Sequence, residues 1–181
     1  MKETILITDI NKLQELYDLL EEYQMYDLNN SNSILTIGYK NVPSSAKDTY
    51  RILQNLQKIN EKKGKYYIEL SLDYLSTVFA TSEECQAERL KKLEQAQLIQ
   101  IHRRAYHINR YIVKEVIPDE TFYETIIKLI ARKNLGLLLA KYEQTNNIQE
   151  KVHLLQQIQS LSKNTSHFKL KKLSSITTNL Q

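Results

Sequence analysis

The scarcity of glycine and proline limits what this chain can fold into more than any other feature. The sequence contains three Gly and two Pro among 181 residues. These two residues supply most of the unusual backbone geometries that turns and irregular loops require. We therefore expect a mainly helical protein with tight connections. The glycines Gly38, Gly64 and Gly136 are also too far apart for a phosphate-binding loop.

The composition indicates a soluble globular protein. Hydrophobic residues make up 41% of the chain and charged residues 25%, which is ordinary for such proteins. The single cysteine, Cys85, excludes an internal disulfide and fits a reducing cytoplasm. No signal peptide is visible, and the longest apolar run, Leu135 to Ala140, is far shorter than the ~20 residues of a membrane span. We expect a cytoplasmic protein with no membrane partner.

Positive charge increases toward the C-terminus. The net charge is −1 over residues 1–64, +1 over 65–118 and +4 over 119–181. Residues 163–181 contain four Lys and no acidic residue, and we expect them to form a basic flexible tail. That tail could contact phosphates nonspecifically or touch an acidic membrane surface, and its few large apolar residues favour the first.

Local patterns divide the chain into four parts. Residues 1–42 are predicted to form an extension with a strand at 4–8, a helix from Asp9 to about Met25 and a strand at 33–42. Residues 43–118 form the central domain. Residues 119–162 form two helices, the first capped by Asp119, and the basic tail follows.

The central domain is predicted to begin with a helix that opens at Pro43 and ends at Gly64. A strand at 65–70 follows, then a helix capped by Ser71. A turn at 80–82 leads to a second helix at 83–96, capped by Thr81 or Ser82. The segments IQIHRR and INRYIVKEVI then form a two-stranded hairpin. The apolar residues that can share one small core are Leu75, Phe79, Leu90, Leu93 and Leu98.

The stretch LSTVFATSEECQAERLKKLEQAQLIQI, residues 75–101, resembles the recognition unit of bacterial winged helix-turn-helix regulators. Leu75 corresponds to the leucine that opens the first helix's buried face, Ala80 to the small turn residue and Ser82 to the start of the second helix. The fold class that we expect is therefore mainly α with a small β-hairpin (α+β), a winged helix-turn-helix with helical flanks. The resemblance implies that the second helix enters a major groove while the hairpin reaches the backbone or an adjacent groove.

The second helix departs from the DNA-reading pattern of that family because its groove-facing end carries Glu83, Glu84 and Glu88. The first two can favour the positive end of the helix dipole, worth about 0.3–1 kcal/mol each. Alternatively, a glutamate can accept a hydrogen bond from cytosine N4. Gln86 replaces the usual apolar residue, so that Cys85 could supply the core contact instead.

Basic groups gather instead around the hairpin, where Arg can bridge phosphates or enter a narrow minor groove. Some such loop tips serve only solubility. The residues that we expect to contact DNA are Ser82, Gln86, Lys91, Lys92, His102, Arg103, Arg104, His107, Asn109 and Arg110.

The C-terminal helices carry more apolar surface than a lone helix can bury. Ile148, Val152, Leu155 and Ile158 are spaced like a short coiled-coil seam. They could pack back on the domain, or they could form a homodimer that reads two half-sites, which is what we expect.

No catalytic motif, cofactor site or metal site is predicted. His102 and His107 could approach each other across the hairpin, but no close Cys pair accompanies them, and zinc sites favour several such ligands at tight spacing. The expected function is binding of double-stranded DNA by a regulator, replication factor or transfer accessory of a bacterium, plasmid or phage, within a nucleoprotein complex or alone. The alternative is a protein-interaction module whose acidic helix faces a protein partner.

Overall fold

The computed structural model describes residues 4–105 and 108–164. Within these residues the chain forms seven α-helices and one three-stranded antiparallel sheet, which confirms the predicted mixed, mainly helical class. The chain divides into two compact units, Met1–Thr125 and Ile126–Gln181. The N-terminal extension and the central domain both belong to the first unit.

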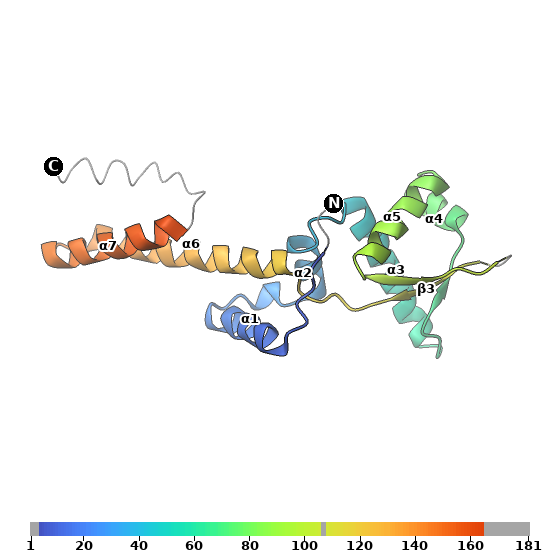
Figure 1. Cartoon of the computed structure of the whole chain (residues 1–181), viewed down its shortest axis with the longest axis horizontal. Helices are drawn as coiled ribbons and strands as arrows, with labels where there is room; N and C mark the ends of the chain where they lie inside the picture. The colour runs from blue at the N-terminus through green and yellow to red at the C-terminus, as the bar shows by residue number, and fades with distance from the viewer. Residues whose placement is uncertain (1–3, 106–107, 165–181) are drawn as a thin grey trace. The chain divides into compact units, whose positions relative to one another are not determined.

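The central domain contains its helices and strands in the predicted order. These elements are α3 (Ser44–Glu61), β1 (Ile68–Glu69), α4 (Leu72–Phe79), α5 (Glu83–Gln95), β2 (Ile99–His102) and β3 (Arg110–Val113). β3 lies in the middle of the sheet, between β1 and β2, and pairs antiparallel with both. α3, α4 and α5 lie beside the sheet, and the β2–β3 hairpin extends past them (Figure 1).

Short polar side chains and one left-handed residue set the α4–α5 geometry. Ser71 Oγ accepts a hydrogen bond from Tyr74 N at the start of α4, and Ser82 Oγ accepts one from Cys85 N at the start of α5. Between the helices, Ala80 ends α4 with a φ of 49°, a left-handed conformation that turns the chain sharply. The predicted caps at Ser71 and Ser82 are thereby confirmed.

The core of the central domain lies between α3, α5 and the sheet. Leu75, Leu90, Leu93 and Leu98 are buried, as expected. Phe79 is only half-buried, contrary to expectation, and the Arg89 guanidinium lies 5.3 Å from its ring centroid. The cation thus covers part of a ring that the core does not bury completely.

The predicted strand at 33–42 is wrong. The N-terminal extension contains α1 (Ile10–Glu22), the 3-10 helix η1 (Tyr26–Leu28) and α2 (Ser31–Ile37). Asn30 Oδ1 accepts a hydrogen bond from Ser33 N and so caps α2. Ile34 and Leu35 are adjacent and both buried, which a helix allows and a half-buried strand does not.

The predicted strand at 4–8 is reduced to a single bridge between Leu6 and Asp119. Ile7 N donates to Pro118 O, and Glu120 N donates to Ile5 O. Pairing cannot extend further because Pro118 has no N–H group and α6 begins at Glu120.

Asp119 connects the start of α6 to the segment after α2, and its backbone pairs with Leu6 in the N-terminal extension. Its side chain is 2% exposed, Oδ1 accepts a hydrogen bond from Phe122 N at 2.8 Å, and Oδ2 accepts one from Tyr39 N at 2.8 Å. The Tyr39 hydroxyl donates to Ile117 O. Beside them, Lys47 Nζ donates to Gly38 O, and burial lowers the pKa of this lysine. The predicted cap at Asp119 is confirmed, and the same side chain also holds the α2–α3 connection.

The second unit contains most of α6 (Glu120–Gln144) and all of α7 (Ile148–Asn164). Lys151 Nζ lies 5.4 Å from the centroid of the Tyr142 ring, so that the first turn of α7 packs beside the last turn of α6. Residues 163 and 164 of the predicted basic tail belong to α7, and the rest of the tail lies outside the described residues. In the described part of the chain, no helix has the length and apolar character that crossing a membrane requires.

We predict that Gly38→Ala lowers the free energy of unfolding by about 1–3 kcal/mol, the usual cost of overpacking. A Cβ at this position would lie 2.4 Å from Asp119 Oδ1 and 2.8 Å from Ile34 O. Gly136→Ala is the control, because its Cβ would meet nothing within 4 Å and alanine favours a helix by up to about 1 kcal/mol. Urea denaturation followed by circular dichroism measures both; equal stability of the two variants would contradict the prediction.

Candidate nucleic-acid interface

The exposed face of α5 is acidic. Glu83, Glu84 and Glu88 are all exposed, together with Ala87. Lys91 is the next exposed position along the helix, about one turn after Glu88. A helix that enters a groove with this end first would bring three carboxylates within a Debye length of phosphates, about 8 Å at physiological salt.

Gln86 is not a DNA contact, contrary to prediction. Its side chain is 0% exposed. Its amide nitrogen donates to Thr81 Oγ1 at 2.7 Å, and its amide oxygen accepts from Thr49 Oγ1 at 3.4 Å. Gln86 therefore fills the core position itself and ties α5 to α3, while Cys85 stays partly exposed. The hydroxyls of Thr49 and Thr81 satisfy a polar side chain where an apolar one was expected.

The other predicted α5 contacts remain at the surface. Ser82 is exposed, although its Oγ already accepts the capping hydrogen bond. Lys91 is exposed, and Lys92 is half-buried with a partner of its own. Of the predicted residues on this helix, only these three could contact DNA.

Glu69 in β1 holds two of the hairpin arginines. Its Oε1 accepts hydrogen bonds from Arg104 Nη2 and from Arg110 Nε, each at 2.9 Å. Arg104 also donates from Nε to Ile108 O, which closes the hairpin. The Arg110 guanidinium lies 4.4 Å from the centroid of the Tyr67 ring. The register places Glu69 directly opposite Arg110, so that strand pairing creates this cluster.

Glu94 in α5 holds the third arginine. Arg103 donates to both of its carboxyl oxygens, at 3.1 and 2.7 Å. Hydrogen bonds from Arg110 and Arg104 lower the pKa of Glu69, and those from Arg103 lower the pKa of Glu94. The three ion pairs of these two carboxylates are therefore complete at neutral pH and are lost as the pH falls through the lowered pKa values.

The remaining predicted hairpin residues lie in different surroundings. His102 is exposed and pairs with Arg110 across the two strands. Asn109 is half-buried and lines a shallow pocket of 480 Å³ together with Ile108, Asp73 and Glu83. His107 lies outside the described residues. The structure thus brings Arg103, Arg104, Arg110, His102 and Asn109 together around the hairpin.

Sequence reasoning missed the role of Glu69 and Glu94. Glu69 is separated from its arginines by 35 and 41 residues in the sequence. Its pairing with the arginines depends on the register of β1 against β3. This register could not be predicted from a strand of only two residues. The aromatic and β-branched residues of KYYIEL predict a strand, but they do not indicate which strand pairs with it.

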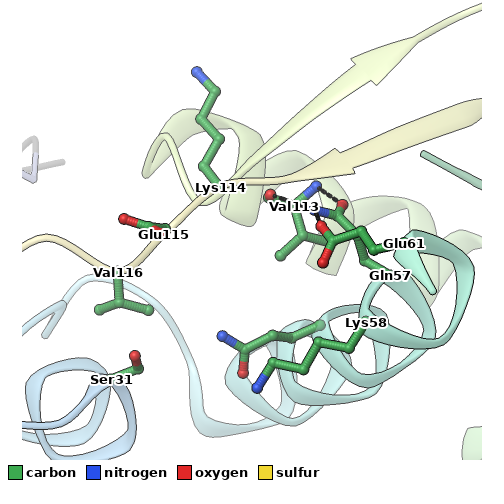
Figure 2. Close-up of a pocket in the computed structure, with 9 residues that line it drawn as sticks. Ser31, Gln57, Lys58, Glu61, Val113, Lys114, Glu115 and Val116 are labelled. Carbon is green, nitrogen blue, oxygen red and sulfur yellow. Dashed lines mark hydrogen bonds between the residues drawn. The ribbon is translucent and has the colours of Figure 1, made fainter. Parts of the chain in front are cut away.

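Sequence reasoning also missed a second basic surface at the C-terminal end of α3. Lys58, Lys62, Lys63 and Lys65 are exposed there. Beside it lies a polar pocket of 410 Å³ between α3, Ser31 and the segment after β3 (Figure 2). The signal that could have revealed it is the run KKGK between a helix and a strand.

The residues of the predicted coiled-coil seam on α7 differ in exposure. Ile148 is 78% exposed and Val152 is 49% exposed, whereas Ile158 is 0% exposed and Leu155 is intermediate. Leu154, one turn before Ile158, is also buried, and the predicted seam omits it. Ile158 is therefore excluded as a dimer contact.

No group of three or more His, Cys, Asp or Glu side chains that could hold a metal ion occurs within residues 4–105 and 108–164. A scan against protein-family models, a search of curated proteins and a search of solved structures each found no match.

We predict that Gln86→Leu lowers the free energy of unfolding by about 0.5–1.5 kcal/mol, because it removes the hydrogen bonds to Thr81 and Thr49, although Thr49 Oγ1 keeps Ser45 O as a partner. Gln95→Leu, at an exposed position of the same helix, should change it by less than about 0.5 kcal/mol. DNA affinity of the folded Gln86→Leu protein should equal that of the wild type. If the Gln86→Leu protein were as stable as the wild type but bound DNA more weakly, Gln86 would be a DNA contact after all.

Proposed function

We propose that residues 43–118 form a winged helix-turn-helix domain that binds double-stranded DNA in the cytoplasm. The elements follow the order expected of that fold, and the sheet order β1–β3–β2 places the hairpin strand β3 in the centre. Residues 43–118 contain 13 basic and 9 acidic residues, a net charge of +4. The protein would act as a regulator, or as a replication or transfer accessory factor, of a bacterium or mobile element.

The observation that carries this proposal is the gathering of Arg103, Arg104 and Arg110 at one end of the hairpin. Their ion pairs with Glu69 and Glu94 are at least partly exposed. Such pairs contribute only about 0–1 kcal/mol each, so that a phosphate can replace the carboxyl partner at little cost. The same contacts hold the hairpin in a defined geometry before DNA arrives.

The acidic face of α5 determines how the DNA would be bound. Three exposed glutamates oppose deep entry of this helix into a groove, and buried Gln86 removes one base-reading side chain. We therefore propose that the hairpin and Lys91 contact the phosphate backbone, while α5 supplies the frame. Such binding depends strongly on salt and weakly on sequence.

Salt dependence tests the hairpin contacts. If Arg103 and Arg104 each neutralise one phosphate, Arg103→Ala/Arg104→Ala should reduce the slope of log affinity against log salt by about 1.8, at about 0.9 per phosphate. The loss should be similar for all duplex sequences. Fluorescence anisotropy with a labelled duplex at rising salt measures the slope, and an unchanged slope would remove the hairpin from the interface.

The matched variant Glu69→Gln should act in the opposite direction. It frees two arginines and removes one negative charge, and we expect DNA affinity to rise about two- to fivefold. Asp48→Asn is the control, because Asp48 pairs with Arg51 at 2.7 Å on the exposed surface of α3. A weaker complex for Glu69→Gln would show that the cluster must stay intact for binding.

The acidic face of α5 favours a second candidate function, a protein-interaction module with a basic protein partner. Glu88→Gln separates the two candidates because Glu88 lies beyond the first turn of α5, where the helix-dipole effect is small. Under the DNA proposal, removal of this charge should tighten nonspecific binding by a few tenths to about 1 kcal/mol.

Affinities of wild type and Glu88→Gln for a specific and a random duplex give three distinct results. Tightening on both supports the DNA proposal. Weakening on the specific duplex alone means that Glu88 accepts a hydrogen bond from cytosine. No change on either duplex would place Glu88, and with it Lys91 one turn later, away from the phosphates, and loss of binding to a basic protein in the same variant would favour the second candidate.

We further propose that the protein forms a homodimer through the exposed part of α7. Ile148 and Val152 lie one turn apart and are both exposed. Ile148→Asp/Val152→Asp should convert the dimer to a monomer, as measured by light scattering, without unfolding the chain. Ile10→Asp is the control, since Ile10 is an exposed apolar residue on α1. A mass that is equal before and after the double substitution would overturn the dimer interface.

A further inference from the structure

The C-terminal end of α3 carries four lysines within eight residues. Lys58, Lys62, Lys63 and Lys65 are exposed, and none of them forms an ion pair within the residues that the structure describes. The one acidic residue among them, Glu61, accepts a hydrogen bond from Gln57 Nε2 at 2.9 Å. Four lysines therefore lie around a single carboxylate, Glu61, and none of the four is held in an ion pair, unlike the arginines of the hairpin.

The turn that presents these lysines is held in one conformation. Gly64 has a φ of +75°, and the backbone N–H groups of Gly64 and Lys65 donate to Glu61 O and Asn60 O. The Asn60 side chain donates to Tyr67 O at 2.9 Å and closes the turn onto β1. Binding here needs little ordering of the backbone, which favours affinity.

An exposed aromatic ring stands next to the lysines. Tyr66 is 72% exposed, whereas its neighbour Tyr67 packs against the Arg110 guanidinium. The negative end of the α3 dipole accounts for Lys58 and Lys62, which lie in or at the last turn. It does not account for Lys65, which follows the turn, or for the exposure of Tyr66.

This surface lies at the end of the sheet opposite the hairpin. Ile68 pairs with Tyr111 and Glu69 with Arg110, so that the residues before Ile68 approach the end of β3 near Val113. Lys114 follows there and lines the polar pocket with Lys58, and Figure 2 shows Lys58 extending from α3 toward Ser31. The lysine surface and the arginine hairpin are therefore separate sites on one domain.

We propose that the turn at residues 62–66, with Lys58, binds single-stranded nucleic acid. The four lysines would contact successive phosphates, and the exposed face of Tyr66 would stack on an unpaired base. Clustered lysines beside an accessible aromatic ring are the combination that single-strand binding uses, since every base offers a face for stacking. A duplex hides its base faces and would use the lysines alone, and an acidic lipid surface would not use the ring for stacking.

The test measures binding of a labelled oligothymidylate of about 20 nucleotides to the full chain. Lys62→Gln/Lys63→Gln/Lys65→Gln should reduce the salt slope by about 2, at about 0.7 per phosphate for single strands. Tyr66→Ala should weaken binding about five- to a hundredfold, while Tyr66→Phe, which keeps the stacking face, should bind like the wild type.

A charge-matched control is Lys40→Gln/Lys128→Gln/Lys141→Gln, which removes three exposed lysines elsewhere and should retain the wild-type slope. Arg103→Ala/Arg104→Ala should retain single-strand binding, so that failure of the duplex proposal and failure of this one give different results.

Three results would overturn the inference. They are an unchanged affinity in the lysine variant, an equal loss in the charge-matched control, and Tyr66→Ala binding as tightly as Tyr66→Phe. Preferential binding of anionic vesicles over the oligonucleotide would also overturn it and would assign the lysines to a membrane surface.

Discussion

The buried carboxyl group of Asp119 is the contact on which the arrangement of the first unit depends. It accepts one hydrogen bond from the first turn of α6 and one from Tyr39, 80 residues earlier. Gly38 is required beside it because a Cβ there would overlap the carboxyl oxygen. Removal of this side chain would leave two buried N–H groups without partners, each costing about 1–3 kcal/mol. The N-terminal extension thus becomes part of the same unit as the central domain.

Carboxyl groups also hold the hairpin in place, here through ion pairs with arginine side chains. Glu69 and Glu94 offset two of the three positive charges of arginines that would otherwise repel one another at the end of two short strands. The pairs fix the hairpin against β1 and α5, and they also place the guanidinium groups where phosphates could replace the carboxyl groups. In contrast, none of the lysines at the end of α3 forms an ion pair within the part of the chain that the structure describes. The domain therefore carries one basic surface held in ion pairs, one lysine surface and an acidic α5 face.

Local chemistry allowed much of the fold to be predicted from sequence. Ser71, Ser82 and Asp119 cap helices as expected, since a capping side chain acts on residues two or three positions away. Predictions failed where contacts between residues far apart in the sequence determine the local structure or the burial of a side chain. The alternation at 33–42 suggested a strand, but burial of adjacent Ile34 and Leu35 requires a helix. Gln86 was taken for a surface residue because its partner Thr49 is 37 residues away.

Arginine side-chain NMR during titration with a duplex tests the central claim most directly, namely that the hairpin and not the α5 acidic face meets DNA. The Nε–H signal of Arg110, which donates to Glu69, reports on the exchange of a carboxyl for a phosphate partner, and the Nε–H signal of Arg104, which donates to Ile108 O, reports on the hairpin beside it. We predict that these signals shift together with the backbone signals of residues 102–105, while those of residues 83–88 stay in place. Shifts centred on residues 83–88, or an absence of shifts with saturating duplex, would contradict the account.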